Sequence, residues 1–154
     1  MQNDEVIIIG ADVVEEAYTW MGTPFVHQAA SKGFGCDCIG MVRGVGRDLD
    51  IFDFDENSPE GRELLSYSLE PEPRRLIKSL NYYFFRVRAG FENGDVVLFA
   101  IQDAPTHVAI VSDVVKGVVI HTWRGMGRVI ETRYGDLLRP TGVWRYPDVA
   151  CEGE

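Results

Sequence analysis

One cysteine stands at a position that suits nucleophilic chemistry. Cys38 follows a glycine-rich loop that contains Gly33 and Gly35, and it begins a run of residues with helical spacing. The first N–H groups of a helix lack partners within the helix, and together with the helix dipole they stabilise an anion. A thiol placed there has a lowered pKa, and the N–H of residue 38 is also available to an oxyanion. The sequence therefore predicts a thiolate nucleophile at Cys38, with a small buried packing residue as the alternative.

Two of the three histidines stand where they can act with this cysteine. His107 opens the apolar run of residues 107–112, and His121 lies 14 positions later in the run of residues 118–123. Residues directly opposite in a hairpin share a face, so a loop of odd length places both imidazoles on one face, whereas a two-residue loop separates them. We predict the odd loop. Cys38, His107 and His121 then supply a nucleophile, a base and a residue that orients the base, unless each histidine is a satisfied core residue.

Two segments with helical spacing precede these histidines. Apolar residues recur in residues 11–21, where Gly22 and Pro24 end the pattern. Residues 38–49 repeat the spacing but contain glycines at 40, 44 and 46, which disfavour an isolated helix. Such a helix must be held by tertiary contacts that need close backbone approach. We therefore expect it to be buried and packed over the histidine hairpin.

The C-terminal half has the pattern of an antiparallel sheet. Residues 81–88 are aromatic and strand-like. Helices followed by an antiparallel sheet predict an α+β fold. Short apolar runs between turn residues predict strands at residues 94–101, 107–112, 118–123, 128–132 and 142–146.

The length predicts one domain over residues 1–154. Within it, residues 50–93 are interpreted as an insertion between the nucleophile helix and the sheet, and residues 148–154 as an acidic tail. We expect a helical turn or two in residues 61–69. Prolines at 71 and 73 are expected to break the structure that follows.

Charge and composition exclude several classes of protein. The 154 residues carry 15 Lys and Arg against 24 Asp and Glu, a net charge of −9. Without a basic block, we expect no nucleic-acid partner and no binding to an anionic surface through the protein's own field. The N-terminus is acidic and no apolar stretch approaches about 18 residues, so we expect cytoplasmic synthesis without a signal peptide and no membrane insertion. Three cysteines without framework spacing indicate reduced thiols.

The residues beside the nucleophile have simpler interpretations as well. Cys36 and Cys38 form a Cys-x-Cys pair, but structural zinc sites usually separate cysteines by about two to four residues, so we expect no metal and no cofactor. Cys36 is expected to pack in the core or to cap Cys38 on oxidation. Asp37 is expected to cap the helix, with tuning of the thiol as the alternative.

Five blocks of the sequence, in this order, resemble those of the NlpC-type papain-like cysteine peptidases. They are residues 22–26 (GTPFV), 33–40 (GFGCDCIG), 94–99 (GDVVLF), 107–110 (HVAI) and 119–122 (VIHT). Three further blocks are similar to the branch found in the tails of phages and gene transfer agents. They are residues 61–65 (GRELL), 105–112 (PTHVAIVS) and 125–131 (GMGRVIE).

The resemblance implies a papain-like fold in which the nucleophile helix packs on a central antiparallel sheet. It also implies hydrolysis of peptide bonds in the peptidoglycan stem, typically between D-Glu and diaminopimelate. Cys38 matches the family's nucleophile, His107 its base and His121 its third polar residue. The partners implied are the stem peptide and the tail-tip or baseplate proteins of a phage-like particle, which would carry the chain to the cell wall.

The chain departs from the resembled family at two positions. Ile39 follows the cysteine where Ser is frequent, and Phe25 stands where a Tyr often supplies a hydroxyl near the oxyanion. We place Phe25, Asp37 and Trp123 beside the substrate. The departures keep open an alternative, a catalytically weak structural or assembly component of a tail tip. The same chemistry on a lipid or small amide is a third option, disfavoured by the lack of an amphipathic membrane-binding segment.

Overall fold

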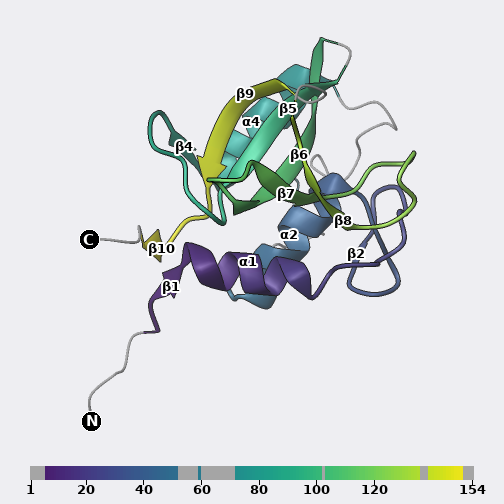
Figure 1. Cartoon of the computed structure of the whole chain (residues 1–154), viewed down its shortest axis with the longest axis horizontal. Coiled ribbons are helices and arrows are strands. Elements are labelled where there is room, and N and C mark those ends of the chain that lie inside the picture. The colour runs from purple at the N-terminus through teal and green to yellow at the C-terminus, as the bar shows by residue number, and fades with distance from the viewer. Residues whose placement is uncertain (1–5, 52–58, 60–71, 102, 136–138, 151–154) are drawn as a thin grey trace.

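The computed structural model describes residues 6–51, 59, 72–101, 103–135 and 139–150 (Figure 1). Three helices and a six-stranded antiparallel sheet make up most of this part of the chain. The helices are α1 (Gly10–Tyr18), α2 (Cys38–Asp48) and α4 (Pro73–Tyr83). The sheet has the order β4 (Phe85–Val87), β9 (Arg139–Arg145), β5 (Val96–Ile101), β6 (Ala104–Asp113), β7 (Val118–His121) and β8 (Ile130–Arg133).

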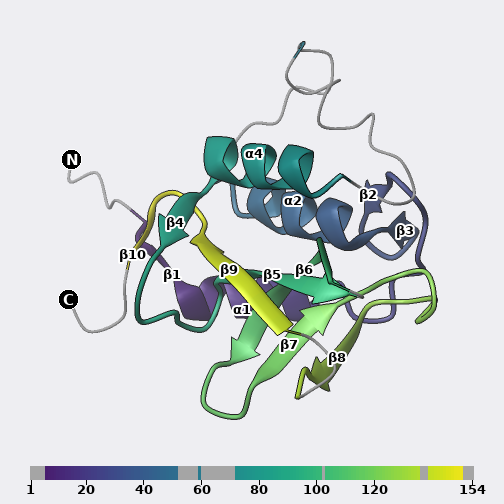
Figure 2. The same ribbon diagram turned by 90° about the horizontal axis from the view of Figure 1, so that it is seen from above.

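Two small ladders complete the fold. β1 (Ile8–Ile9) pairs in parallel with β10 (Val149–Ala150), which brings the two ends of the described chain together (Figure 2). β2 (Ala30–Ser31) pairs antiparallel with β3 (Gly35–Cys36), directly before α2. The α+β prediction is confirmed. In the described part of the chain, no helix has the length and apolar character needed to cross a bilayer.

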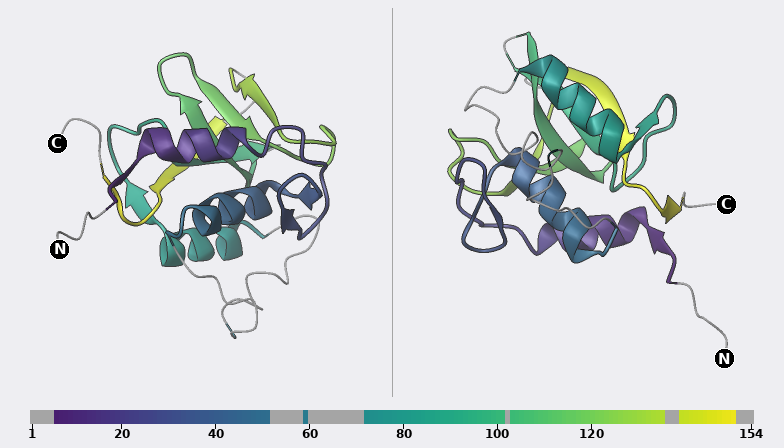
Figure 3. Two further views of the ribbon diagram at one scale, coloured as in Figure 1. Left: turned by 90° about the horizontal axis from the view of Figure 1, so that it is seen from below. Right: turned by 180° about the vertical axis from the view of Figure 1, so that it is seen from behind.

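Among the described residues, the helices cover one face of the six-stranded sheet. Val108 and Ile110 of β6 pack in one core with apolar residues of α1, α2 and α4, and Figure 3 shows α2 between the other two helices. Ala109 and Val111, which alternate with them, belong to a second cluster with Phe99 on the opposite face. The second cluster is closed by half-buried aromatic residues and not by a helix.

The glycines of α2 allow the close approach that the sequence predicted, although the partner differs. A Cβ on Gly40 would lie 1.8 Å from the carbonyl oxygen of Ala29, and one on Gly44 would lie 2.2 Å from the Trp20 ring. Both neighbours belong to the segment between α1 and α2. The helix is therefore buried against β6 by its apolar side chains and against this preceding segment by its glycines.

The structure corrects two predictions for residues 73–88, the extent of the aromatic strand and the effect of Pro73. Residues 81–83, expected in a strand, end α4, and only Phe85–Val87 form β4. Pro73 does not break the chain but occupies the first turn of α4, where its missing N–H costs nothing. Leu76 and Leu80, four residues apart, bury one face of that helix. The expectations for residues 52–58, 60–71 and 151–154 lie outside the described residues.

The β6–β7 hairpin reaches the predicted geometry by a different route. Its connection, residues 114–117, has an even number of residues. The register shifts between Val111 and Asp113, so one extra residue is inserted as a bulge. Ile110 pairs with Ile120, and the odd count between paired residues is restored. The prediction of an odd loop is wrong, but the two histidines still share one face.

Candidate active site

Asp37 organises the backbone that presents Cys38. It is the N-cap of α2, and its Oδ1 accepts a hydrogen bond from the Gly40 N–H at 2.7 Å. Its Oδ2 accepts from the Gln28 N–H at 2.7 Å, which ties the preceding loop to the helix. The residue is 4% exposed. The expected capping role is confirmed, and this burial leaves the carboxylate as a support for the nucleophile more than a contact for substrate.

The sulfur of Cys38 lies between the first turn of α2 and the backbone of β6. The N–H groups of Cys38 and Ile39 act on it from the helix, and the N–H of Val108 acts on it from the strand; each lowers its pKa. Val108 directly follows His107. The fold therefore brings Cys38 to the strand that carries the predicted base, with part of the cysteine accessible to solvent.

His107 and His121 are directly coupled. His107 Nε2 and His121 Nδ1 are 2.8 Å apart, and the ring centroids are separated by 5.1 Å. The residues are 2% and 0% exposed. Because Nε2 of His107 is engaged with His121, its Nδ1 is the ring nitrogen left for a thiol. The arrangement matches a base with a second imidazole behind it.

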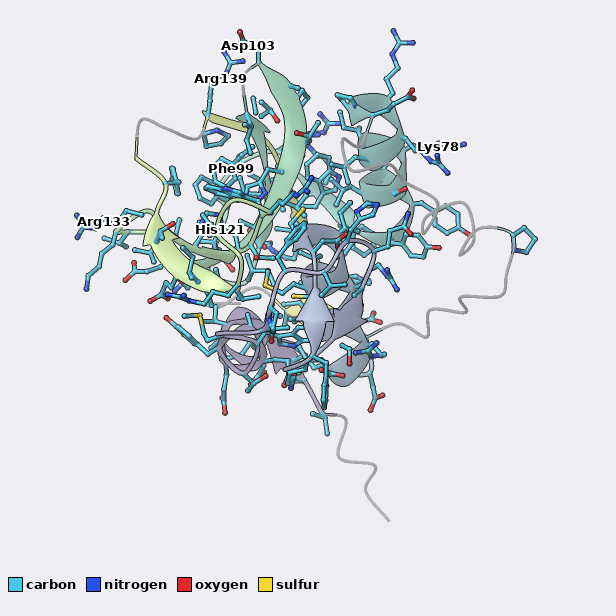
Figure 4. All side chains as sticks on the ribbon, turned by 90° about the vertical axis from the view of Figure 1, so that its right-hand side faces the viewer. Lys78, Phe99, Asp103, His121, Arg133 and Arg139 are labelled. Carbon is cyan, nitrogen blue, oxygen red and sulfur yellow. The ribbon has the colours of Figure 1, made fainter. Side chains whose placement is uncertain are left out.

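Aromatic rings surround this pair. Trp123 stands edge-on to both imidazoles, with centroid distances of 5.1 Å to each, and Phe99 lies 6.4 Å from His107. Figure 4 shows Phe99 and His121 among the strands, on the other side of the sheet from the helix that carries Lys78. Trp123, expected beside the substrate, thus contacts both imidazoles and limits their access to water.

The sequence predicted that the helix carrying Cys38 packs over the histidine hairpin. The helix does pack on β6, but on the face opposite the imidazoles. α2 packs on the face of β6 that carries Val108 and Ile110, whereas the imidazoles project from the face of Ala109. Side chains alternate along a strand, so a helix over residue 108 cannot also lie over residue 107. Cys38 instead approaches the backbone of β6 at Val108, in the middle of the strand.

Burial holds these three groups in their neutral forms. It raises the pKa of Cys38 to about 12, with a further contribution from the Asp37 charge. It lowers the pKa of His107 to about 3, assisted by the neighbouring His121, and the pKa of His121 to about 4. The predicted lowering of the thiol pKa is therefore wrong. The N–H groups at the helix start do stabilise a thiolate, but desolvation of the sulfur outweighs them.

Phe25 and Cys36 lie on paired segments next to the nucleophile. Phe25 forms a parallel bridge with Cys36, and its N–H donates to the carbonyl of Gly127 at 2.9 Å. It is half-buried. Cys36 is 0% exposed and burial raises its pKa to about 12, which confirms it as a packing residue. Phe25 is thus joined through Gly127 to the loop that begins at Trp123.

Sequence reasoning missed one residue in contact with the histidines. Thr132 Oγ1 lies 2.7 Å from His121 Nε2, the ring nitrogen that His107 does not use. β7 and β8 pair so that Val119 faces Thr132, which puts the hydroxyl on the same face as both imidazoles. The strand at residues 128–132 was predicted, but its register against β7 depends on the folded sheet. In the described part of the chain, no group of three or more metal-ligating side chains occurs.

Comparisons with solved structures identify the architecture. NlpC2 from Trichomonas vaginalis superposes with a TM-score of 0.65 at 16% identity, covering 94% of this chain and 48% of its own. The NlpC/p60 domain of the peptidoglycan hydrolase SagA gives a TM-score of 0.58 at 21% identity, covering 89% of this chain and 98% of its own. The chain has the NlpC/p60 fold. The expected papain-like architecture, with the nucleophile helix packed on an antiparallel sheet, is thereby confirmed.

The similarity to solved structures covers most of this chain but only part of some of the proteins compared. The peptidoglycan hydrolase RipB from Mycobacterium tuberculosis superposes on this chain with a TM-score of 0.55 at 19% identity, over 88% of this chain and 63% of its own. The chain spans about half the length of the two Trichomonas proteins, at 48% and 44%. No protein-family model matches the sequence, and no curated protein matches it.

Proposed function

We propose that this chain is a cysteine peptidase that hydrolyses peptide bonds of peptidoglycan stem peptides. The observation that carries the proposal is the coupling of His107 to His121. His107 lies on β6, whose backbone contacts the Cys38 sulfur, and His121 lies on the neighbouring strand β7. A buried base oriented by a second imidazole and adjacent to a thiol is the arrangement that acyl transfer needs. Two proteins with this fold, SagA and RipB, are described as peptidoglycan hydrolases.

The first half of the reaction forms a thioester. The Cys38 sulfur attacks the amide carbonyl as its proton passes to Nδ1 of His107, and the Nε2–H of His107 donates to Nδ1 of His121. The oxyanion forms beside the first turn of α2, where the N–H of Cys38 is available to it. His107 then gives its proton to the leaving amine nitrogen, and the C–N bond breaks.

The second half releases the acid. Water enters in place of the amine, gives a proton to Nδ1 of His107 and attacks the thioester carbonyl. The C–S bond breaks and the proton returns to sulfur, so the protein is regenerated without a net change of charge. Because the resting pair is neutral, the proton moves as the new bond forms, and no preformed thiolate is required.

The finer assignment rests on the sequence blocks described above. We propose the bond between D-Glu and diaminopimelate as the target, with Phe25 and Trp123 on the two flanks of the nucleophile. We further propose that the chain is carried by a phage or gene-transfer-agent tail, with tail-tip or baseplate proteins as partners, and acts in the cell wall. The net charge of −9 supports delivery by a carrier over independent accumulation on an anionic wall.

Digestion of purified sacculi tests the proposal. The wild-type protein is expected to release soluble muropeptides whose masses, determined by mass spectrometry, identify the bond that is cut. Cys38→Ala removes the nucleophile and is expected to release none, with an unchanged circular dichroism spectrum. Cys151→Ala is the matched control, since it removes another thiol and should cut like wild type. Equal release by Cys38→Ala and wild type would contradict the assignment.

The charge state of the nucleophile supports a second candidate, a structural tail component with weak catalysis. Burial raises the pKa of Cys38 to about 12, and Phe25 lacks the hydroxyl that a Tyr would offer to an oxyanion. This candidate predicts slow alkylation of Cys38 by iodoacetamide together with no release of muropeptides by the wild-type protein. Rapid alkylation of Cys38 and release from sacculi would exclude it.

A further inference from the structure

Three side chains form a hydrogen-bonded line across the sheet. His107 Nε2 is 2.8 Å from His121 Nδ1, and His121 Nε2 is 2.7 Å from the hydroxyl of Thr132. The Cys38 sulfur meets the backbone of β6 at Val108, the residue after His107. Both imidazoles are buried, whereas Thr132 is half-buried on β8. Each ring nitrogen of His121 therefore has a defined partner.

When His107 holds the proton of the thiol, its charge determines which ring nitrogens of His107 and His121 carry hydrogen. Both nitrogens of an imidazolium carry hydrogen, so His107 Nε2–H must donate to a lone pair on Nδ1 of His121. A neutral imidazole has hydrogen on the other nitrogen, so His121 then carries it on Nε2. That N–H points at Thr132 Oγ1, which must accept it. A hydroxyl does so, because it both donates and accepts.

We infer that Thr132 is a positioning residue, whose hydroxyl holds His121 in the Nε2–H tautomer that lets His107 take the proton of Cys38. Thr132 touches neither the thiol nor the reacting carbonyl. It acts by giving the buried Nε2–H an acceptor as charge develops on His107. The inference rests on the proposed pairing of Cys38 with His107.

A variant without an acceptor should disturb this line in a specific way. Thr132→Val keeps the shape of the side chain but leaves the Nε2–H of His121 unpaired inside the sheet, which costs more than an unpaired lone pair. His121 is then expected to shift its hydrogen to Nδ1. In that tautomer, Nδ1–H confronts the Nε2–H of a charged His107, so proton uptake from the thiol is opposed.

Alkylation of Cys38 by iodoacetamide measures the effect without any peptidoglycan. In this reaction the sulfur forms a bond to the methylene carbon, iodide leaves, and the thiol proton passes to His107. The rate at neutral pH, followed by fragmentation mass spectrometry that separates Cys38 from Cys36, is expected to fall about tenfold in Thr132→Val. Thr132→Ser restores the hydroxyl and should recover most of the rate. Thr141→Val, which removes a hydroxyl bonded to the Leu98 carbonyl, should leave the rate unchanged.

Nitrogen-15 NMR of the histidine rings supplies the second readout. Wild type and Thr132→Ser are expected to show His121 with hydrogen on Nε2, and Thr132→Val with more hydrogen on Nδ1. A wild-type alkylation rate in Thr132→Val, an unchanged tautomer, or a Ser variant as slow as the Val variant would overturn the inference. Should the Val variant not fold, Thr132→Ala is judged by the same two readouts.

The outcomes separate this inference from the proposed substrate. If sacculi are not cut but the serine-rescued loss of alkylation is found, Thr132 retains its role and only the peptidoglycan substrate fails. If sacculi are cut by wild type and Thr132→Val alkylates normally, the proposed function stands and the role of Thr132 is refuted.

Discussion

At the scale of single residues, the site combines a thiol and two imidazoles that are all neutral at rest. Burial disfavours charge on each of them, and the Asp37 carboxylate opposes a thiolate further. Local N–H groups from α2 and β6 partly compensate. In the proposed reaction, Cys38 therefore reacts by concerted proton transfer to His107 and not as a preformed thiolate.

The buried histidines give stability a defined dependence on pH. The pKa values of His107 and His121 fall to about 3 and about 4 in the folded protein, below the ordinary value of 6.5. Between these values the unfolded chain binds more protons than the folded one, so acid favours unfolding. The stability from neutral burial is fully present above about pH 6.5 and is lost as pH falls toward about 4.

A double variant, His107→Gln with His121→Gln, removes this dependence. Its urea unfolding midpoint is expected to fall less than that of wild type between about pH 7 and about pH 4.5. Thr141→Val is the control, because it removes no titratable group and should leave the wild-type dependence in place. An equally large acid shift in the double variant would mean that the histidines are not the buried neutral groups described here.

At the scale of elements, the start of α2 is fixed by contacts that leave no room for a side chain. Gly40 sits under the Ala29 carbonyl and donates to Asp37, and Gly44 sits under the Trp20 ring. The β6–β7 bulge fixes the histidines in the same way, through register and not through local sequence. The start of α2 and the histidine pair are therefore each positioned by contacts between separate elements.

Adding one carbon to α2 tests the first of these contacts. Gly40→Ala places a Cβ 1.8 Å from a backbone oxygen, so the loop or helix must shift. We expect a loss of roughly 1–3 kcal/mol in the free energy of unfolding, although alanine is the better helix former. Alkylation of Cys38 should also slow. Urea unfolding measures the first effect and iodoacetamide the second.

Two further variants serve as comparisons for Gly40→Ala. Gly44→Ala meets a ring at 2.2 Å and should destabilise as well. Its effect on Cys38 should be smaller, because Gly44 lies more than one turn beyond Cys38 along the helix. Glu15→Ala, on the exposed surface of α1, should change stability by less than about 0.5 kcal/mol. A Gly40→Ala variant as stable and as reactive as wild type would show that the close contact is not required.

At the scale of the whole molecule, the NlpC/p60 fold carries a strong negative charge. The net charge of −9 opposes approach to anionic wall polymers, and this chain spans about half the length of the two Trichomonas proteins with the same fold. At 14–21% identity the solved structures establish the fold, and the fold does not by itself specify a substrate.

Salt should therefore increase the association of the isolated protein with cell walls. Repulsion between like charges is screened as ionic strength rises from about 0.01 M to about 0.15 M, since the Debye length falls from roughly 30 Å to roughly 8 Å. Co-sedimentation of Cys38→Ala with purified sacculi measures the bound fraction without digestion. Sacculi stripped of anionic polymers are the control and should show little dependence on salt. Binding that weakens with salt would contradict the electrostatic explanation.

Much of the architecture could be read from local patterns. Helical spacing predicted α1 and α2, the cap at Asp37 followed from its residue type, and the apolar runs predicted the strands that carry His107 and His121. These features depend on residues within a dozen positions of one another, where propensity and capping act. The aromatic run at residues 81–88 was misassigned because its helical half is stabilised by burial of Leu76 and Leu80.

The sequence by itself determined which residues are available for chemistry, their order along the chain and the α+β class. Only the tertiary structure decided that the Cys38 thiol is neutral, that α2 packs on the face opposite the imidazoles, and that Thr132 bonds His121. Desolvation and strand register arise from segments far apart in the chain. No local pattern encodes them, so the charge state of Cys38 and the contact between Thr132 and His121 are decided on folding.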